Sequence, residues 1–162
     1  IFISGFKINY GIKTNIFKKN HVYMAIIDTS VDINASVDKV WDIISDLDGE
    51  PKFWKGIKET RMISRDGNVV TREITIAFRD SKCMQKITIQ PKEKILVEHT
   101  KGIIKGSKTL TLKPKDGGSL LEVNWDVKMS GLAGMFTGMI KKHIRNGTEQ
   151  AMEAIKQHAE RS

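Results

Sequence analysis

The sequence predicts a single α+β domain, in which a curved antiparallel sheet of about seven strands wraps around one long C-terminal helix. Two observations lead to this prediction. The segment from Ser130 to about His158 has the periodicity of one amphipathic helix. Before it, about six strand-like stretches follow one another and are separated by turn residues. Because the sequence lacks the βαβ alternation of a parallel sheet, the strands are expected to form an antiparallel meander.

Length and composition are those of an ordinary globular domain. The 162 residues correspond to about one domain with a substantial core, and the contents of 40% apolar and 28% charged residues are typical of soluble proteins. No run of about 20 apolar residues predicts a transmembrane helix. The single cysteine, Cys83, excludes an internal disulfide and fits a reducing compartment, so a cytoplasmic location is expected.

The net charge of +8 is unevenly distributed along the chain. Residues 1–23 contain four lysines and no acidic residue, whereas residues 24–162 contain 23 basic and 19 acidic side chains. The four lysines are Lys7, Lys13, Lys18 and Lys19. Since the remaining excess is mild and spread over the surface, the folded domain is not expected to bind nucleic acid.

Residues 1–23 are therefore treated as a basic N-terminal extension that is either not native or disordered. It precedes a domain spanning residues 24–162. Three interpretations compete. In the first, the extension is an artefact of a misplaced gene start, with Met24 as the natural initiator, or a partial tail. In the second, it is a basic arm that touches a membrane or a partner. In the third, it is a secretory leader. The leader is disfavoured, because Lys7 and Lys13 interrupt any apolar stretch.

The domain begins with a strand and two short helices. Residues 24–33 alternate apolar and polar side chains, which is typical of a half-buried strand. Ser36 can cap a following helix that contains Trp41 and ends near Asp46. The break at Gly49-Glu50-Pro51 precedes Phe53-Trp54, where a second short helix is expected.

The remaining strands are predicted at Ile57–Ser64, Val69–Phe78, Cys83–Gln90, Lys94–Lys101, Lys105–Lys113 and Ser119–Met129. Asp66-Gly67 favours a hairpin between the first two of them. Arg72 is an exception on the apolar face of its strand, between Val70 and Ile74. We expect Arg72 to face outward, with the register shifted by one residue; an inward Arg72 would instead anchor an acidic ligand head.

The segment from Val31 to Trp54 (VDINASVDKVWDIISDLDGEPKFW), together with the order of elements, resembles the START-like (SRPBCC) superfamily. The matching features are an Ala followed by Val-Trp on the first helix, then Asp, then Pro-x-Phe-Trp. The most similar branch is that of polyketide cyclases/dehydrases and lipid-transport proteins, which includes coenzyme Q-binding proteins. The resemblance covers about residues 24–160. It implies a helix-grip fold with a hydrophobic ligand cavity between the sheet and the C-terminal helix.

Signatures of metal, nucleotide and cofactor chemistry are missing from the sequence. Neither G-x-G-x-x-G nor G-x-x-x-x-G-K-[ST] occurs. The histidines and the cysteine do not have the spacing of metal ligands; they are His21, His99, His143, His158 and Cys83. No cofactor and no metal site are therefore predicted.

Two histidines are candidate catalytic residues. His143 falls in the predicted apolar arc of the long helix, and His99 shares a strand face with Ile95 and Val97. In the fold that the resemblance implies, both could point into the cavity and act as acid or base near neutral pH. The favoured alternative is that each lies at the edge of the core and bonds to a backbone group or to water.

Gly147 also lies in the predicted arc, and a glycine inside a helix costs about 1 kcal/mol relative to alanine. Close packing of the helix on the sheet is the favoured reason, and space for a ligand is the alternative. Met135 and Met139 flank the arc, where methionine fills irregular apolar space.

The primary functional prediction is binding or transport of an apolar small molecule, such as a lipid, an isoprenoid quinone or a polyketide-like compound. The alternatives are a cyclase/dehydratase-type enzyme that uses His143 or His99, and a module that contacts a ribosome or, transiently, a membrane. The sequence identifies neither the ligand nor the oligomeric state. The predicted ligand-binding residues are Phe53, Trp54, Ile74, Ile76, Phe78, Ile87, Ile89, Val97, His99, Trp125, Met135, Met139, Ile140, His143 and Gly147.

Overall fold

The computed structural model describes residues 6–9, 22–130 and 137–162, and for residues 6–9, 22–23, 129–130 and 137 it describes the backbone only. The elements in chain order are β1 (Phe6–Asn9), β2 (Val22–Ile33), α1 (Val37–Ile44), the 3-10 helix η1 (Glu50–Lys52), β3 (Ile57–Asp66), β4 (Val69–Ile76), the 3-10 helix η2 (Phe78–Asp80), β5 (Lys82–Gln90), β6 (Lys94–Lys101), β7 (Lys105–Lys115), β8 (Gly118–Ser130) and α2 (Thr137–Arg161).

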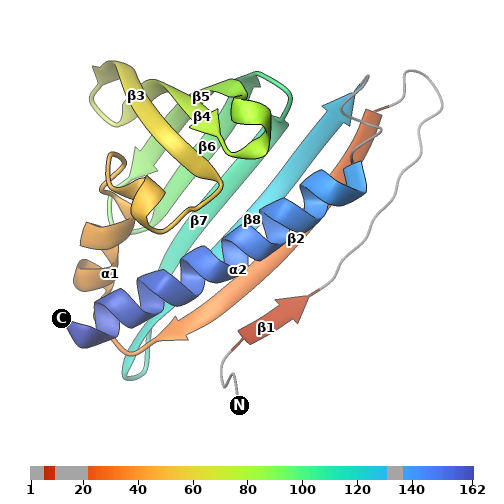
Figure 1. Ribbon diagram of the computed structural model, residues 1–162. Coiled ribbons are helices and arrows are strands. Elements are labelled where there is room, and N and C mark those ends of the chain that lie inside the picture. The colour runs from red at the N-terminus through yellow and green to blue at the C-terminus, as the bar shows by residue number, and fades with distance from the viewer. Residues whose placement is uncertain (1–5, 10–21, 131–136) are drawn as a thin grey trace.

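The strands in the described part of the chain form one antiparallel sheet in the order β1-β2-β8-β7-β6-β5-β4-β3. Strands β2 to β8 are the seven that the sequence predicts, and β1 adds a short edge strand through the register Phe6↔Val31. Helix α2 lies across one face of the sheet alongside β2 and β8, and α1 packs near its C-terminal end (Figure 1). The predicted α+β helix-grip fold, with a curved sheet around a long C-terminal helix, is confirmed.

The first helix begins where its sequence predicts. The Ser36 hydroxyl accepts a hydrogen bond from the backbone N–H of Lys39 at 3.3 Å, which caps the helix, and Trp41 is buried on its inner face. The second short helix is one turn of 3-10 helix at Glu50–Lys52 with Pro51 in its first turn. Phe53 and Trp54 follow this turn and are not part of it, so the predicted position was late by a few residues.

The prediction that Arg72 faces outward was wrong. Buried and partly buried residues alternate along β4, and Arg72 is only 2% exposed, on the same face as Val70 and Ile74. The register is therefore the one that the apolar pattern indicates. An arginine can occupy this inner position because its N–H groups have hydrogen-bond partners inside the domain, as described below.

The boundaries and the buried face of the long helix also differ from the prediction. Ser130 ends β8, and the described part of α2 runs from Thr137 to Arg161. Its buried face consists of Ile140, Thr148, Ala151, Met152, Ile155 and Ala159. His143 and His158 are exposed, so the predicted arc was rotated away from the true one. The reason is Thr148, which periodicity counts as polar but which buries its hydroxyl by hydrogen bonding.

Candidate functional site

A cavity of about 490 Å³ lies between α2 and the sheet. Strands β3 to β8, the segment Trp54–Gly56, the 3-10 helix η2 and the first half of α2 supply its walls. Most of the large side chains on these walls are apolar: Trp54, Ile57, Ile74, Ile76, Phe78, Ile104, Trp125, Ile140 and Ile144. A volume of this size is within the range of cavities that enclose a small-molecule ligand.

Most of the predicted ligand-binding residues line this cavity. They are Trp54, Ile74, Ile76, Phe78, His99, Trp125, Ile140, His143 and Gly147. These side chains come from separate segments of the chain, which only the curvature of the sheet around α2 brings together.

The other predicted residues lie elsewhere. The cavity reaches β5 only at Gln85, so Ile87 and Ile89, further along the strand, are buried in the core away from it. Phe53 and Val97 line a separate cavity of about 20 Å³. The ring of Phe53 lies 5.6 Å from that of His158, near the C-terminal end of α2.

The two methionines do not contribute to the described cavity wall. Met139 is 44% exposed, because it lies on the solvent side of α2 next to the buried Ile140. Met135 lies outside the described residues.

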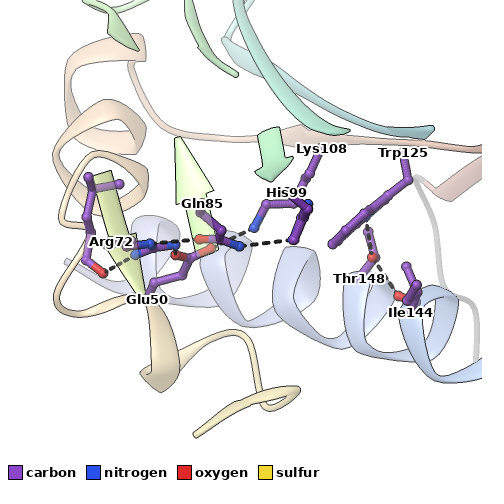
Figure 2. Close-up of polar contacts among 9 residues, drawn as sticks. Glu50, Arg72, Gln85, His99, Lys108, Trp125, Ile144 and Thr148 are labelled. Carbon is purple, nitrogen blue, oxygen red and sulfur yellow. Dashed lines mark hydrogen bonds and ion pairs between the residues drawn. The ribbon is translucent and has the colours of Figure 1, made fainter. Parts of the chain in front are cut away.

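Three charged residues, Glu50, Arg72 and Lys108, form a buried group that reaches the cavity through Lys108. Figure 2 shows the contacts within this group, of which the sequence analysis identified Arg72 alone. The Lys108 ammonium donates to Glu50 Oε1 at 2.6 Å, and Arg72 Nη2 donates to Glu50 Oε2. Arg72 Nη1 also donates to the carbonyl of Leu47 at 3.0 Å. One carboxylate is thus shared by two cations, and the exposed fractions of the Arg72 and Lys108 side chains are 2% and 1%.

Neutral side chains continue this network toward β6. Arg72 Nε donates to Gln85 Oε1 at 2.8 Å, and Gln85 Nε2 lies 3.0 Å from His99 Nε2. Arginine can only donate, so the Gln85 oxygen accepts and its NH₂ group must donate to His99. His99 Nε2 is therefore an acceptor, and the proton of the neutral ring is on Nδ1.

The protonation states follow from burial and from these contacts. Burial acts to raise the pKa of Glu50, but the charges and hydrogen bonds of Lys108 and Arg72 outweigh it and lower this pKa to about 2. Burial lowers the pKa of Lys108, and Glu50 opposes this effect. Burial, aided by the charge of Lys108, lowers the pKa of His99 from 6.5 to about 4. At neutral pH the site holds an ionised Glu50 and a neutral His99.

Two aromatic rings of the cavity wall lie near the Lys108 ammonium. Its Nζ lies 3.9 Å from the ring centroid of Trp54 and 5.5 Å from that of Trp125. Trp125 Nε1 donates to the Thr148 hydroxyl at 2.9 Å, and this hydroxyl donates to the carbonyl of Ile144 at 2.7 Å. The Trp125 ring is thereby held between β8 and α2.

The signal that could have found Lys108 and Gln85 is present in the sequence. Lys108 lies on the same face of β7 as Leu110 and Leu112, and Gln85 lies on the same face of β5 as Ile87. A charged residue at an apolar position of a strand indicates a buried ion pair or a site. Glu50 gives no such signal, because it lies in a turn.

The two candidate catalytic histidines differ in their surroundings. His99 is buried, stacks on Trp125 with 5.8 Å between ring centroids, and uses its only acceptor nitrogen for Gln85. His143 lines the cavity from the exposed side of α2. No hydrogen bond among the described residues joins His99 to His143.

We expect the protein to lose stability as the pH falls from 6.5 toward 4. The unfolded chain protonates His99 near pH 6.5 but the folded protein only near pH 4, so acid favours the unfolded state by about 2–3 kcal/mol across this window. Urea unfolding at several pH values measures this loss, and His99→Gln should remove most of it. The control is the exposed His143→Gln, which should keep the wild-type pH dependence; an unchanged dependence in His99→Gln would contradict the assignment.

The described residues contain no group of three or more His, Cys, Asp or Glu side chains arranged to hold a metal ion. Among the same residues, no helix is both long and apolar enough to cross a membrane.

A curved antiparallel sheet packed against one long helix, with a largely apolar cavity between them, defines the helix-grip fold of the START-like class. The chain belongs to the family described as polyketide cyclase / dehydrase and lipid transport, whose model matches residues 24–160. The resemblance that the segment from Val31 to Trp54 indicates is thereby confirmed.

Solved structures with this fold have very different sequences. The Zhui aromatase/cyclase from Streptomyces sp. R1128 superposes with a TM-score of 0.76 at 15% identity, covering 85% of this chain and 94% of that one. A START superfamily protein from Mycobacterium smegmatis gives 0.65 at 19% identity, covering 84% and 97%. A protein from Thermus thermophilus gives 0.72 at 11% identity, covering 83% and 97%. Identities this low show the fold alone, and no curated protein matches the chain.

Proposed function

We propose that this protein binds an apolar small molecule in the cavity between α2 and the sheet. Lipids, isoprenoid quinones and polyketide-like compounds belong to this class. The observation that carries the proposal is the cavity itself, which has a volume of about 490 Å³ and mostly aliphatic and aromatic walls. Binding buries apolar ligand surface at roughly 25 cal/mol per Å², and a few polar groups suffice to orient the ligand.

The contacts of the histidines favour binding over a cyclase/dehydratase reaction. A general base needs a free lone pair within reach of the substrate. His99 offers its Nε2 lone pair to Gln85, and burial keeps the ring neutral. His143 is exposed at the cavity wall. The printed description of the Zhui structure as an aromatase/cyclase keeps the enzymatic alternative as a second outcome of the test below.

Ligand uptake can be measured through the two tryptophans in the cavity wall. We expect saturable quenching or enhancement of Trp54 and Trp125 fluorescence when a panel of fatty acids, fatty alcohols, quinones and polycyclic aromatics is added, with about one ligand bound per chain. Native mass spectrometry of protein purified from its own host should reveal a bound apolar compound. A protein that carries no compound and takes up no member of the panel would refute the proposal. Turnover of a panel member would favour the enzymatic alternative.

A further inference from the structure

The charges around the cavity are all of one sign. Lys55, Arg79 and Lys108 contribute to its walls, and among the described lining residues there is no Asp or Glu. Glu50, the acidic residue of the buried group, does not line the cavity and accepts a hydrogen bond from the Lys108 ammonium. A ligand in the cavity is therefore exposed to cationic side chains and to neutral ones.

The buried group has one positive charge in excess. Arg72 is cationic, and the contact of 2.6 Å with the ionised Glu50 favours the charged form of Lys108. Glu50 is the single carboxylate that the two share, and His99 accepts a hydrogen bond as a neutral ring. Both cationic side chains are almost completely removed from solvent. An uncompensated charge in such surroundings is costly, and a negative group that enters the site offsets this cost.

Lys108 has the donors that such a group requires. Its ammonium has three N–H groups, and among the described residues Glu50 provides its oxygen acceptor. The ammonium also lies near the rings of Trp54 and Trp125, which line the cavity and do not accept conventional hydrogen bonds. Arg72, by contrast, donates to three different partners, and it does not line the cavity.

We propose that the cavity is selective for apolar molecules that carry one acidic oxygen group, and that this group binds to the Lys108 ammonium. The group is a carboxylate, or the phenolate or enolate oxygen of an aromatic compound. The apolar remainder lies against the isoleucines of β4 and α2: Ile74, Ile76, Ile140 and Ile144. This inference rests on the proposed function and adds the chemical class of the ligand head.

Probes that differ only in the head group test the inference. Dodecanoate, dodecan-1-ol and dodecylamine share one tail, and 2-naphthoate and 2-naphthamide form an aromatic pair. Wild-type protein should bind each acid at least about tenfold more tightly than its neutral partner, because a charge-assisted hydrogen bond is stronger than a neutral one. Dodecylamine should bind most weakly. Comparing the two series shows whether an aliphatic or an aromatic acid fits better.

Two substitutions at position 108 and one at the wall locate the acidic head. Lys108→Met removes the charge while keeping a long unbranched side chain, so the acid and the alcohol should bind about equally. Lys108→Arg keeps the charge and should keep the preference. The control is Lys55→Gln, which removes an exposed cation of the wall and should leave the preference for the acid intact. The ratio of the affinities of wild-type protein for an acid and for its neutral partner is itself a test, and it does not depend on whether a variant folds.

The outcomes separate this inference from the proposed function. If neutral probes bind and the acids bind no better, the preference for an acidic head is refuted and apolar binding stands. If Lys108→Met keeps the preference and Lys55→Gln loses it, the anchor at Lys108 is refuted. If no probe of either series binds, the proposed function itself fails.

Discussion

Replacing Glu50 by glutamine should lower the free energy of unfolding by about 3–5 kcal/mol, which is the usual cost of removing one partner of a buried ion pair. Glu50 is the only carboxylate in the described structure that contacts Arg72 and Lys108, and both cations are almost fully buried. In the variant two buried positive charges remain without a counterion. Since domains of this size are stable by about 5–15 kcal/mol, a large share of the total would be lost. Urea unfolding at pH 7 measures this change.

Two further variants make the experiment specific. Glu122→Gln removes the partner of Lys113 from a surface pair, and it should change stability by less than about 1 kcal/mol. Combining Glu50→Gln with Lys108→Met removes one cation together with the carboxylate and should recover part of the loss. If Glu50→Gln were as mild as Glu122→Gln, the central role of this carboxylate would be wrong.

Replacing Gly147 by leucine should abolish ligand uptake and leave the fold intact. The prediction that Gly147 allows close packing of α2 on the sheet was wrong. A Cβ atom at this position would meet nothing within 4 Å. Gly147 lines the cavity, so a leucine side chain would occupy space that we assign to the ligand. We expect affinity for any apolar probe to fall at least about tenfold. The free energy of unfolding should stay the same or rise by up to about 1 kcal/mol, because leucine favours helix more than glycine does.

The matched control for this variant lies in the same helix. Gly138 also has open space around its Cβ position but does not line the cavity, so Gly138→Leu should improve helix propensity without affecting uptake. Fluorescence titration with a neutral probe and urea unfolding of both variants complete the comparison. Unfolding of Gly147→Leu would restore the packing interpretation, and unchanged uptake would show that ligand does not occupy this part of the cavity.

The order and type of the elements could be predicted from the sequence because they depend on neighbours along the chain. The alternation in β2 and β4 to β8 reports which side chains face the core, and the bounds of β6 match the prediction. The cap at Ser36 is equally local, since its hydroxyl bonds to a backbone group three residues away. Together these features define an antiparallel sheet with one long helix, which is most of the fold.

The wall of the cavity could be predicted in part, for the same reason. Apolar residues on the inner faces of β4, β8 and α2 are recognised by period, and many of them line the cavity. The extent of the cavity along each strand is not a local property, which is why Ile87 and Ile89 were included and Lys108 was overlooked. The buried side of α2 was misjudged because the hydroxyl of Thr148 finds its partners in Ile144 and in the distant Trp125.

By itself, the sequence determined the helix-grip architecture and the apolar character of the space inside it. Only the tertiary structure decided what lies at the inner side of that space. Glu50 is 22 residues from Arg72 and 58 residues from Lys108, so no local pattern can show that the two cations share one carboxylate. A charge on an inner strand face is unfavourable unless a partner of opposite charge lies beside it. Here that partner comes from a turn that the fold places beside the sheet.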